Sequence, residues 1–265
     1  MKKAILFAAH GSKNRAASSA LGNILKMAKE RHPDVLIQSA FTSGHILKKL
    51  KEQGQSLPSV KQNLEMLAEK GITHVVVQSL HVIPGTEFNN ISRLIDRVNR
   101  GEIPLQKVVL GAPLLTGEQE IDEVSDMILN LIPERDPQTE ALILVAHGSK
   151  YSDSGNALYD RFKHALETKD SNAYLGKLNA EDGIEAISDR IRKSGIKKAY
   201  LLPLLFGAGN HVKKDMAGDH DGSWKNIVSS RGIEVVTVPR GIGEFDIFAE
   251  RWMDNLEKAF RELEN

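Results

Sequence analysis

The sequence contains no cysteine, and this absence excludes several kinds of chemistry at once. Without thiols the chain can form no disulfide, no thiolate metal site and no cysteine nucleophile. Any metal that it binds must therefore be held by imidazole, carboxylate or amide groups.

Net charge and long apolar runs are absent as well. The 35 basic and 35 acidic residues cancel, so no overall field favours nucleic acid or an anionic membrane. No stretch approaches the ~18 apolar residues that a membrane-spanning helix needs. The N-terminal apolar run ends at His10, too early for a signal peptide, and is better interpreted as a first strand. We therefore expect a cytoplasmic protein without nucleic-acid or membrane partners, and we leave a homo-oligomer open.

Several catalytic signatures are also missing. The chain has no Gly-x-Gly-x-x-Gly after a strand, no phosphate-binding loop ending in Gly-Lys-Ser/Thr, no His-Glu-x-x-His and no Gly-x-Ser-x-Gly. Nucleotide-driven chemistry and the common hydrolytic mechanisms thus lose support.

The sequence does contain a regular alternation of strand-length apolar runs and longer segments with helical periodicity. This alternation is typical of βαβ units, and it predicts an α/β fold with parallel sheets flanked by helices. The predicted strands are Ala4–Ala9, Val35–Phe41, Thr73–Leu80, Lys107–Ala112, Ala141–Ala146, Ala173–Leu178, Ala199–Leu204 and Glu234–Val238.

An internal repeat indicates how these units are organised. The segment Ile5–Lys13 recurs as Ile143–Lys150, with Ala-His-Gly-Ser-Lys in both copies. Further on, Pro84–Glu87 parallels Ala208–His211. Such self-similarity predicts two α/β domains of similar topology.

The polar stretch Pro133–Gln138, with its two prolines, is the natural connection between these domains. We therefore expect domains at 1–135 and 136–265, the second carrying a metal site.

Two histidines are the strongest functional candidates. In open α/β sheets, ligands bind beyond the carboxyl ends of the strands. His147 directly follows a predicted strand, and His211 lies in the glycine-rich loop Gly207–His211 after another. If those strands are neighbours, about 5 Å apart, both imidazoles can reach one ion. Neutral imidazole suits Co, Ni, Fe and Zn, and it can also accept a proton. The plainer alternative is that each histidine only hydrogen-bonds a neighbouring loop.

Weaker candidates occupy the matching strand ends of the first domain. His81 and Glu87 follow its third predicted strand, and His10 mirrors His147. They are expected to contact substrate, although a capping Glu, a loop His and a vestige of duplication are equally simple interpretations. The run Asp215–Ser223 contains oxygen ligands for a hard cation, but a turn and an N-cap explain it better.

A set of short motifs occurs along the chain in one order. The motifs are Ala40–Gly44, Gln78–Ile83, Gly111–Leu115, His147-Gly148, Asp215–Ala217 and Gly222–Lys225. With this series the chain resembles the anaerobic sirohydrochlorin cobaltochelatases (the CbiK type) among the class II tetrapyrrole chelatases. The resemblance implies a chelatase-like fold of two similar α/β domains, with the tetrapyrrole in a ligand cleft between them.

The resemblance also implies a reaction and a set of roles. The reaction is ATP-independent insertion of Co²⁺ into sirohydrochlorin in anaerobic cobalamin synthesis, with Co²⁺ as substrate and no permanently bound cofactor. His147 matches the family histidine that binds metal and takes a pyrrole proton, and His211 matches a second ligand. The third family ligand is a glutamate, and its position here holds Asn179. An amide adds no negative charge, so we expect a weaker resting metal site, with Glu181 or Glu87 as stand-ins.

Three alternatives stay open. The same site could insert Fe²⁺ or Ni²⁺, because imidazole–oxygen sites select poorly between these ions. The protein could bind a tetrapyrrole without catalysis, or bind another small molecule without metal. In the catalytic interpretation, His147, or a partner such as His81, accepts the displaced protons.

Overall fold

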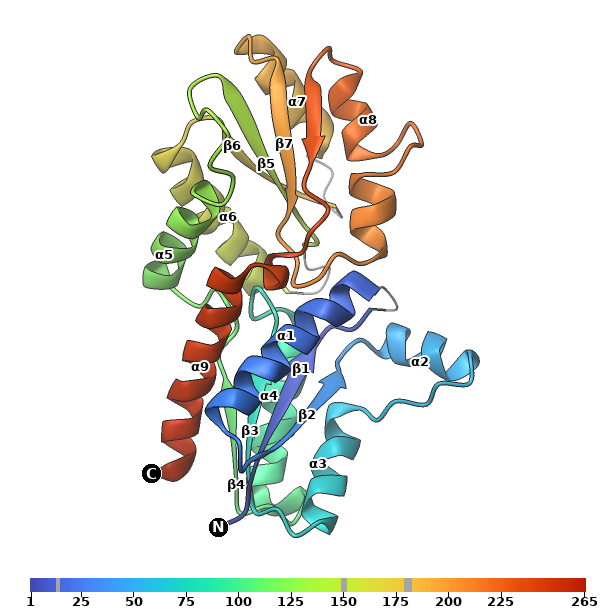
Figure 1. The fold of residues 1–265 in the computed structure, drawn as a ribbon, viewed down its shortest axis with the longest axis vertical. Helices are drawn as coiled ribbons and strands as arrows, with labels where there is room; N and C mark the ends of the chain where they lie inside the picture. The colour runs from blue at the N-terminus through green and yellow to red at the C-terminus, as the bar shows by residue number, and fades with distance from the viewer. Residues whose placement is uncertain (13–14, 149–151, 179–182) are drawn as a thin grey trace. The chain divides into compact units, whose positions relative to one another are not determined.

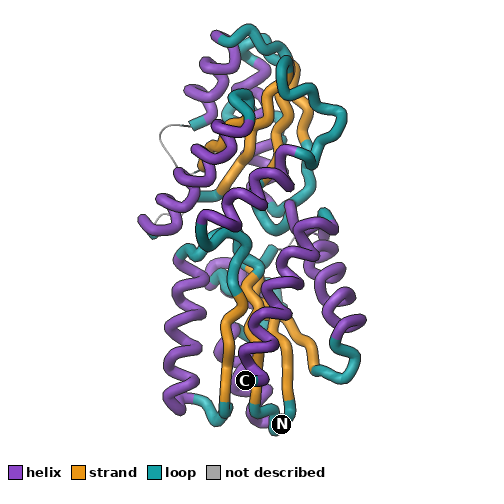
Figure 2. The backbone as a smooth tube through the Cα atoms, turned by 90° about the vertical axis from the view of Figure 1, so that its left-hand side faces the viewer, coloured by secondary structure: helices purple, strands orange, loops and turns teal. Residues whose placement is uncertain are grey.

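The computed structural model describes residues 1–12, 15–148, 152–178 and 183–265. The chain divides into two compact units, one made of Met1–Leu114 with Gly243–Asn265 and the other of Leu115–Ile242. Each unit contains a four-stranded parallel sheet flanked by helices (Figures 1 and 2). The expected α/β class and the parallel sheets are confirmed.

In unit 1, which comprises Met1–Leu114 and Gly243–Asn265, the strand order is β2-β1-β3-β4. The strands are β1 (Lys3–Ala9), β2 (Leu36–Phe41), β3 (His74–Ser79) and β4 (Lys107–Gly111). The helices are α1 (Arg15–Arg31), α2 (Gly44–Glu52), α3 (Val60–Glu69), α4 (Thr86–Arg97) with the turn η1 (Val98–Glu102), and α9 (Asp246–Glu264) after the turn η3 (Ile242–Glu244).

In unit 2, Leu115–Ile242, the strand order is β6-β5-β7-β8, the same arrangement as in unit 1. The repeat therefore reflects a shared topology. The strands are β5 (Glu140–Ala146), β6 (Ala173–Lys177), β7 (Lys198–Pro203) and β8 (Glu234–Thr237). The helices are α5 (Glu118–Leu129), α6 (Asp153–Lys169), α7 (Ile184–Lys193), the π-helical turn η2 (Val212–Met216) and α8 (Trp224–Ser229).

The central strands form the core of each unit. Strand β1 is buried from Ala4 to Ala9, and β5 from Ala141 to Ala146. Strands that are covered on both faces have continuous apolar sequences, which is the pattern of these two segments. All eight predicted strands are present, with ends within a few residues of those expected.

The boundaries of the units differ from the expected 1–135 and 136–265. Helix α5 belongs to unit 2, where it packs against α6, and α9 belongs to unit 1, where it packs against β3, β4 and α1. Trp252 of α9 is fully buried, and Asn255 Nδ2 donates to the Pro113 carbonyl at 2.9 Å. The apolar stripe of a helix shows that one face is buried, but it carries no information about which sheet covers that face.

The predicted connection Pro133–Gln138 is anchored inside unit 2. Arg135 forms a buried ion pair with Asp170 at 2.6 Å, and its guanidinium also donates to the Glu140 carbonyl at 2.9 Å.

Within the described part of the chain, no helix has the length and apolar character needed to cross a membrane.

Candidate functional site: a histidine pair in unit 2

The two candidate histidines of unit 2 come together. Strands β5 and β7 are neighbours, with Val145 paired to Pro203, so both strands end at the same edge of the sheet. His147 and His211 follow these ends, and their ring centroids lie 4.8 Å apart at an interplanar angle of 73°. The prediction that these side chains converge, although they stand 64 positions apart (211 − 147), is confirmed. They are called the histidine pair below.

Glycines allow the backbone to reach this arrangement. Gly148 has φ +74°, a conformation that other residues adopt only with strain, and it turns the chain immediately after His147. The loop before His211 is held by Gly241, where an added Cβ would lie 2.4 Å from the Gly207 Cα. Ile242 N also donates to the Leu205 carbonyl at 2.8 Å. The role of Gly241 was not visible in the sequence, since it depends on contact with a loop more than thirty residues earlier.

Hydrogen bonds orient both imidazoles. His147 Nδ1 lies 3.1 Å from the Gly148 carbonyl, and His211 Nδ1 lies 2.5 Å from Asp215 Oδ2. A carbonyl or a carboxylate can only accept, so in each neutral ring Nδ1 carries the proton and Nε2 carries the lone pair. In this tautomer Nε2 is the ring nitrogen that can bind a cation.

The separation of the rings fits binding of one ion by both. Imidazoles bound cis to each other, with metal–nitrogen bonds of about 2.1 Å, have ring centroids about 4.5–5.5 Å apart. The observed 4.8 Å falls in this interval. It also falls in the range of ordinary edge-to-face aromatic pairs, so the donor chemistry of the rings is what favours a metal.

Among the residues that the structure describes, no three His, Asp or Glu side chains form a metal-binding group. The predicted third ligand Asn179 and its neighbour Glu181 lie outside the described residues. Asp215, which the sequence pattern assigns to a turn, contacts His211 at Nδ1. The available signal was its position four residues after His211 in a helical turn.

The corresponding positions of unit 1 also come together, with different chemistry. His10 follows β1, Glu87 lies in the first turn of α4, and His10 Nδ1 is 3.7 Å from Glu87 Oε1. In the repeat, His10 corresponds to His147 and Glu87 to His211. Unit 1 therefore places an imidazole and a carboxylate where unit 2 places two imidazoles.

The third candidate of unit 1, His81, is partly buried between two hydroxyl groups. Its Nε2 lies 3.1 Å from Thr42 Oγ1, and its Nδ1 lies 2.9 Å from Ser79 Oγ. Burial, with a smaller contribution from the charge of His10, lowers the pKa of His81 to about 3. His81 therefore stays neutral near pH 7, and the expectation that it could take up displaced protons is not supported.

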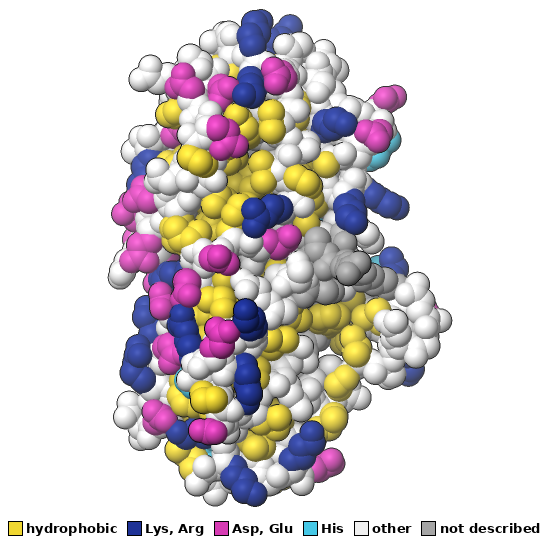
Figure 3. Space-filling view, viewed as in Figure 1, with side chains coloured by type: hydrophobic (Ala, Val, Ile, Leu, Met, Phe, Trp, Pro, Cys, Tyr) yellow, Lys and Arg dark blue, Asp and Glu magenta, His cyan; other side chains and the backbone are white. Residues whose placement is uncertain are grey.

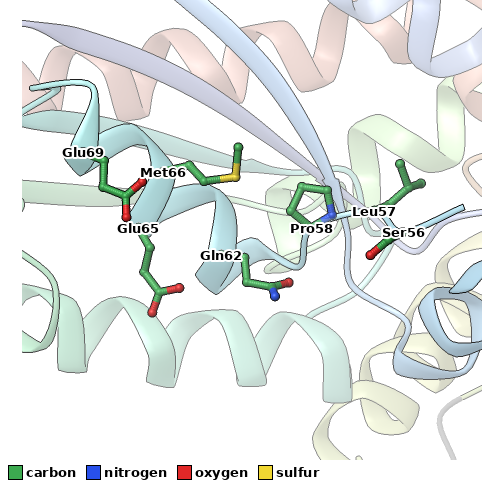
Figure 4. A pocket seen from close by; sticks show the side chains of 7 residues that line it. All are labelled: Ser56, Leu57, Pro58, Gln62, Glu65, Met66 and Glu69. Carbon is green, nitrogen blue, oxygen red and sulfur yellow. The ribbon is translucent and has the colours of Figure 1, made fainter.

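A separate depression lies on the surface of unit 1 and contains none of the candidate residues. Figure 4 shows its polar side chains along α3, together with Leu57 and Pro58 from the preceding loop. Gln62 there closes a capping box with Ser59, since Ser59 N donates to Gln62 Oε1 at 2.9 Å. Among the polar residues that line this depression, Gln62 thus serves the start of α3. On the face shown in Figure 3, acidic and basic side chains are interspersed, as the zero net charge suggests.

Comparison with solved structures defines the fold class. SirB from Bacillus subtilis, solved with Fe³⁺, matches with a TM-score of 0.66 over 99% of both chains at 16% identity. CbiX, described as the terminal enzyme for biosynthesis of siroheme in denitrifying bacteria, matches with a TM-score of 0.60 over 97% of this chain and 99% of the other at 15% identity. The protein has the two-domain fold of the tetrapyrrole chelatases.

Sequence comparison is more specific. A sirohydrochlorin cobaltochelatase of Nitratidesulfovibrio vulgaris, CbiKC, is 30% identical over all of this chain and 93% of its own length. The sirohydrochlorin cobaltochelatase of Salmonella typhimurium is 29% identical over 98% of this chain and 97% of its own length. The family model described as cobalt chelatase (CbiK) matches residues 3–261. The chain belongs to the CbiK family of cobalt chelatases.

Proposed function

We propose that the protein inserts Co²⁺ into sirohydrochlorin without ATP, as a cytoplasmic step of anaerobic cobalamin biosynthesis. Family membership over nearly the whole chain supports the reaction, and two relatives are named for it. The observation that carries the proposal is the histidine pair, whose rings lie 4.8 Å apart beyond neighbouring strands.

In this proposal, His147 and His211 bind Co²⁺ through Nε2. Imidazole nitrogen suits late first-row ions, and a chain without cysteine offers no thiolate alternative. The Nδ1 contacts of both rings leave each Nε2 lone pair directed away from its own hydrogen-bond partner.

The same pair accounts for the proton balance of insertion. Two pyrrole N–H protons leave the macrocycle when one divalent ion enters it. The two imidazoles lose that ion at the same moment, so each Nε2 lone pair becomes able to accept one proton. The site loses the two positive charges of the ion and gains two protons, so its total charge does not change. We assign His147 the catalytic proton transfer, because imidazole is the side chain that most often acts as a general base.

Asn179 is the proposed third metal ligand, at the position where the family has a glutamate. Its amide oxygen can coordinate but adds no negative charge, so the resting site would hold its ion weakly. Weak holding suits a protein that must release the ion into its substrate.

We further propose that His10, His81 and Glu87 contact the tetrapyrrole. His81 would do so as a neutral ring, because burial lowers its pKa to about 3. Co²⁺ as the inserted ion is also part of this proposal, because imidazole donors would accept Fe²⁺ or Ni²⁺ as well.

An anaerobic insertion assay tests the function. Wild type, His147→Ala and His211→Ala are compared by the absorbance change of sirohydrochlorin with Co²⁺, Fe²⁺ and Ni²⁺. We expect turnover with Co²⁺ to be fastest, and each substitution to lower it at least ~100-fold, as for the loss of an acid–base group. His164→Ala, on the exposed face of α6, is the control and should match wild type.

Two outcomes would contradict the proposal. Equal rates in all four proteins would remove the histidine pair from the mechanism. A tight sirohydrochlorin complex with no metal-dependent spectral change would identify a tetrapyrrole-binding protein without catalysis.

A further inference from the structure

We propose that Asp215 is a positioning residue, whose carboxylate holds the His211 ring in the orientation and tautomer that present Nε2 to a metal ion. This inference rests on the proposed function in so far as His211 binds metal. Its basis is the contact of 2.5 Å between Asp215 Oδ2 and His211 Nδ1. A carboxylate can only accept this hydrogen bond, so the contact selects the ring with its proton on Nδ1.

The turn that carries both residues is anchored in the core of unit 2. The residues that follow each of them, Val212 and Met216, are 1% and 0% exposed. One side of the turn η2 is thereby fixed to the protein, while His211 and Asp215, four positions apart, lie half-exposed beside each other. Their contact therefore follows from the packing of the turn.

The end of the turn is closed by further contacts. Ala217 N donates to the Val212 carbonyl at 3.0 Å, and His220 Nε2 lies 2.9 Å from the Lys214 carbonyl. Gly218 approaches the same carbonyl so closely that an added Cβ would lie 2.3 Å from its oxygen. These contacts thus hold the backbone on both sides of Asp215 in place.

The other polar residues of the run Asp215–Ser223 make different contacts. Ser223 Oγ accepts from Asn226 N at 3.3 Å and caps α8, as expected for this run. Asp219 is 95% exposed and pairs with Lys225 at 3.0 Å. Asp215 is the acidic residue of this run whose carboxylate reaches a proposed metal ligand.

The histidine pair is asymmetric in this respect. The partner of His147 Nδ1 is a main-chain carbonyl, which no side-chain substitution removes, whereas the partner of His211 Nδ1 is a side chain. Partners behind a metal-binding histidine fix its tautomer and raise its basicity, and losing one typically weakens metal binding 10–100-fold.

The test measures Co²⁺ binding to metal-free protein, by anaerobic titration of the cobalt d–d absorbance. We expect Asp215→Ala to raise the Kd about 10–100-fold. Asp215→Asn should lie between wild type and Asp215→Ala, because its amide oxygen can accept the hydrogen bond without the charge. Asp219→Asn removes the same charge four positions further along the chain, and should bind Co²⁺ as wild type does.

A second measurement separates positioning from a structural role. The ¹⁵N shifts of His211 in the metal-free protein, at a pH where the ring is neutral, report which nitrogen carries the proton. We expect Nδ1–H in wild type and a shift towards Nε2–H in Asp215→Ala, with an unchanged thermal midpoint. In His211→Ala, adding Asp215→Ala should cause no further loss of Co²⁺ affinity.

Wild-type tautomer or wild-type Co²⁺ affinity in Asp215→Ala would overturn the inference, as would a further loss in the double variant. Failure of the proposed function alone would look different. The tautomer and the Co²⁺ affinity would then respond to Asp215 as expected, while wild type inserted no cobalt.

Discussion

The two units have the same strand order and place candidate side chains at matching strand ends, yet the chemistry of those side chains differs. Unit 1 has His10 beside Glu87, and unit 2 has His147 beside His211. An imidazole and a carboxylate can satisfy each other by holding a proton as an ion pair. In unit 2 both Nδ1 atoms face an acceptor, so both Nε2 atoms of the neutral rings carry lone pairs and cannot hydrogen-bond each other. The same backbone plan thus supports an imidazole beside a carboxylate in one unit and two imidazoles in the other.

The largest expected effect is on stability. It is tested by breaking one ion pair in unit 2 and one in unit 1. Arg135 and Asp170 are 3% and 7% exposed, so Arg135→Met leaves a buried carboxylate without its partner. We expect the free energy of unfolding to fall by about 3–5 kcal/mol in urea titrations. Lys61→Met breaks an exposed ion pair with Glu102 and should change the free energy of unfolding little. Similar losses in both variants would show that burial does not distinguish these pairs.

The next effect compares the two strand-end histidines directly. We expect His147→Ala to lower kcat for cobalt insertion at least ~100-fold, because it removes the proposed metal ligand and proton acceptor. His10→Ala should act mainly on KM, since its proposed role is substrate contact. Steady-state assays under anaerobic conditions measure both parameters. A drop in kcat for His10→Ala as large as that for His147→Ala would mean that the two units contribute equally to the chemistry.

A third effect is pH-dependent and arises from His81, whose position in the repeat is occupied by Leu205 in unit 2. The pKa of His81 is lowered to about 3 in the folded protein, against about 6.5 when unfolded. The unfolded chain therefore binds a proton that the folded protein does not, and stability falls as pH drops below about 6.5, by about 2 kcal/mol between pH 7 and pH 5. In His81→Leu this component should disappear from the pH dependence of urea unfolding. A pH profile parallel to that of wild type would refute the assignment.

The smallest effect compares the glycines that follow His10 and His147. Gly11 and Gly148 both have positive φ, +97° and +74°. An added Cβ at Gly11 would lie 2.7 Å from Phe41 Cγ, whereas at Gly148 the nearest atom, Lys177 Cβ, is 3.4 Å away. Both alanine variants should be strained, and Gly11→Ala should be the less stable by about 1 kcal/mol or more, because overpacking adds to the strain. The reverse order in thermal unfolding would show that the space around Phe41 adapts more easily than these distances suggest.

Much of this architecture was predictable because it is encoded locally. Strands that are buried on both faces require continuous apolar runs, so β1 and β5 were identifiable from composition. The repeat then predicted equal topologies. The convergence of His147 and His211 followed from their positions after two strands that were expected to be neighbours. The hydrogen bonds of His81 with Thr42 and Ser79 were not predictable in the same way, since they depend on how separate loops pack.

The sequence by itself determined the strands, the duplication and the pair of imidazoles, because periodicity and residue type report what each segment must bury or can bind. Only the tertiary structure decided that α9 covers the sheet of unit 1, that Gly241 packs against Gly207, and that Asp215 reaches His211. An apolar stripe or a carboxylate shows that a partner is needed, and the partner is chosen by packing between segments far apart in the chain.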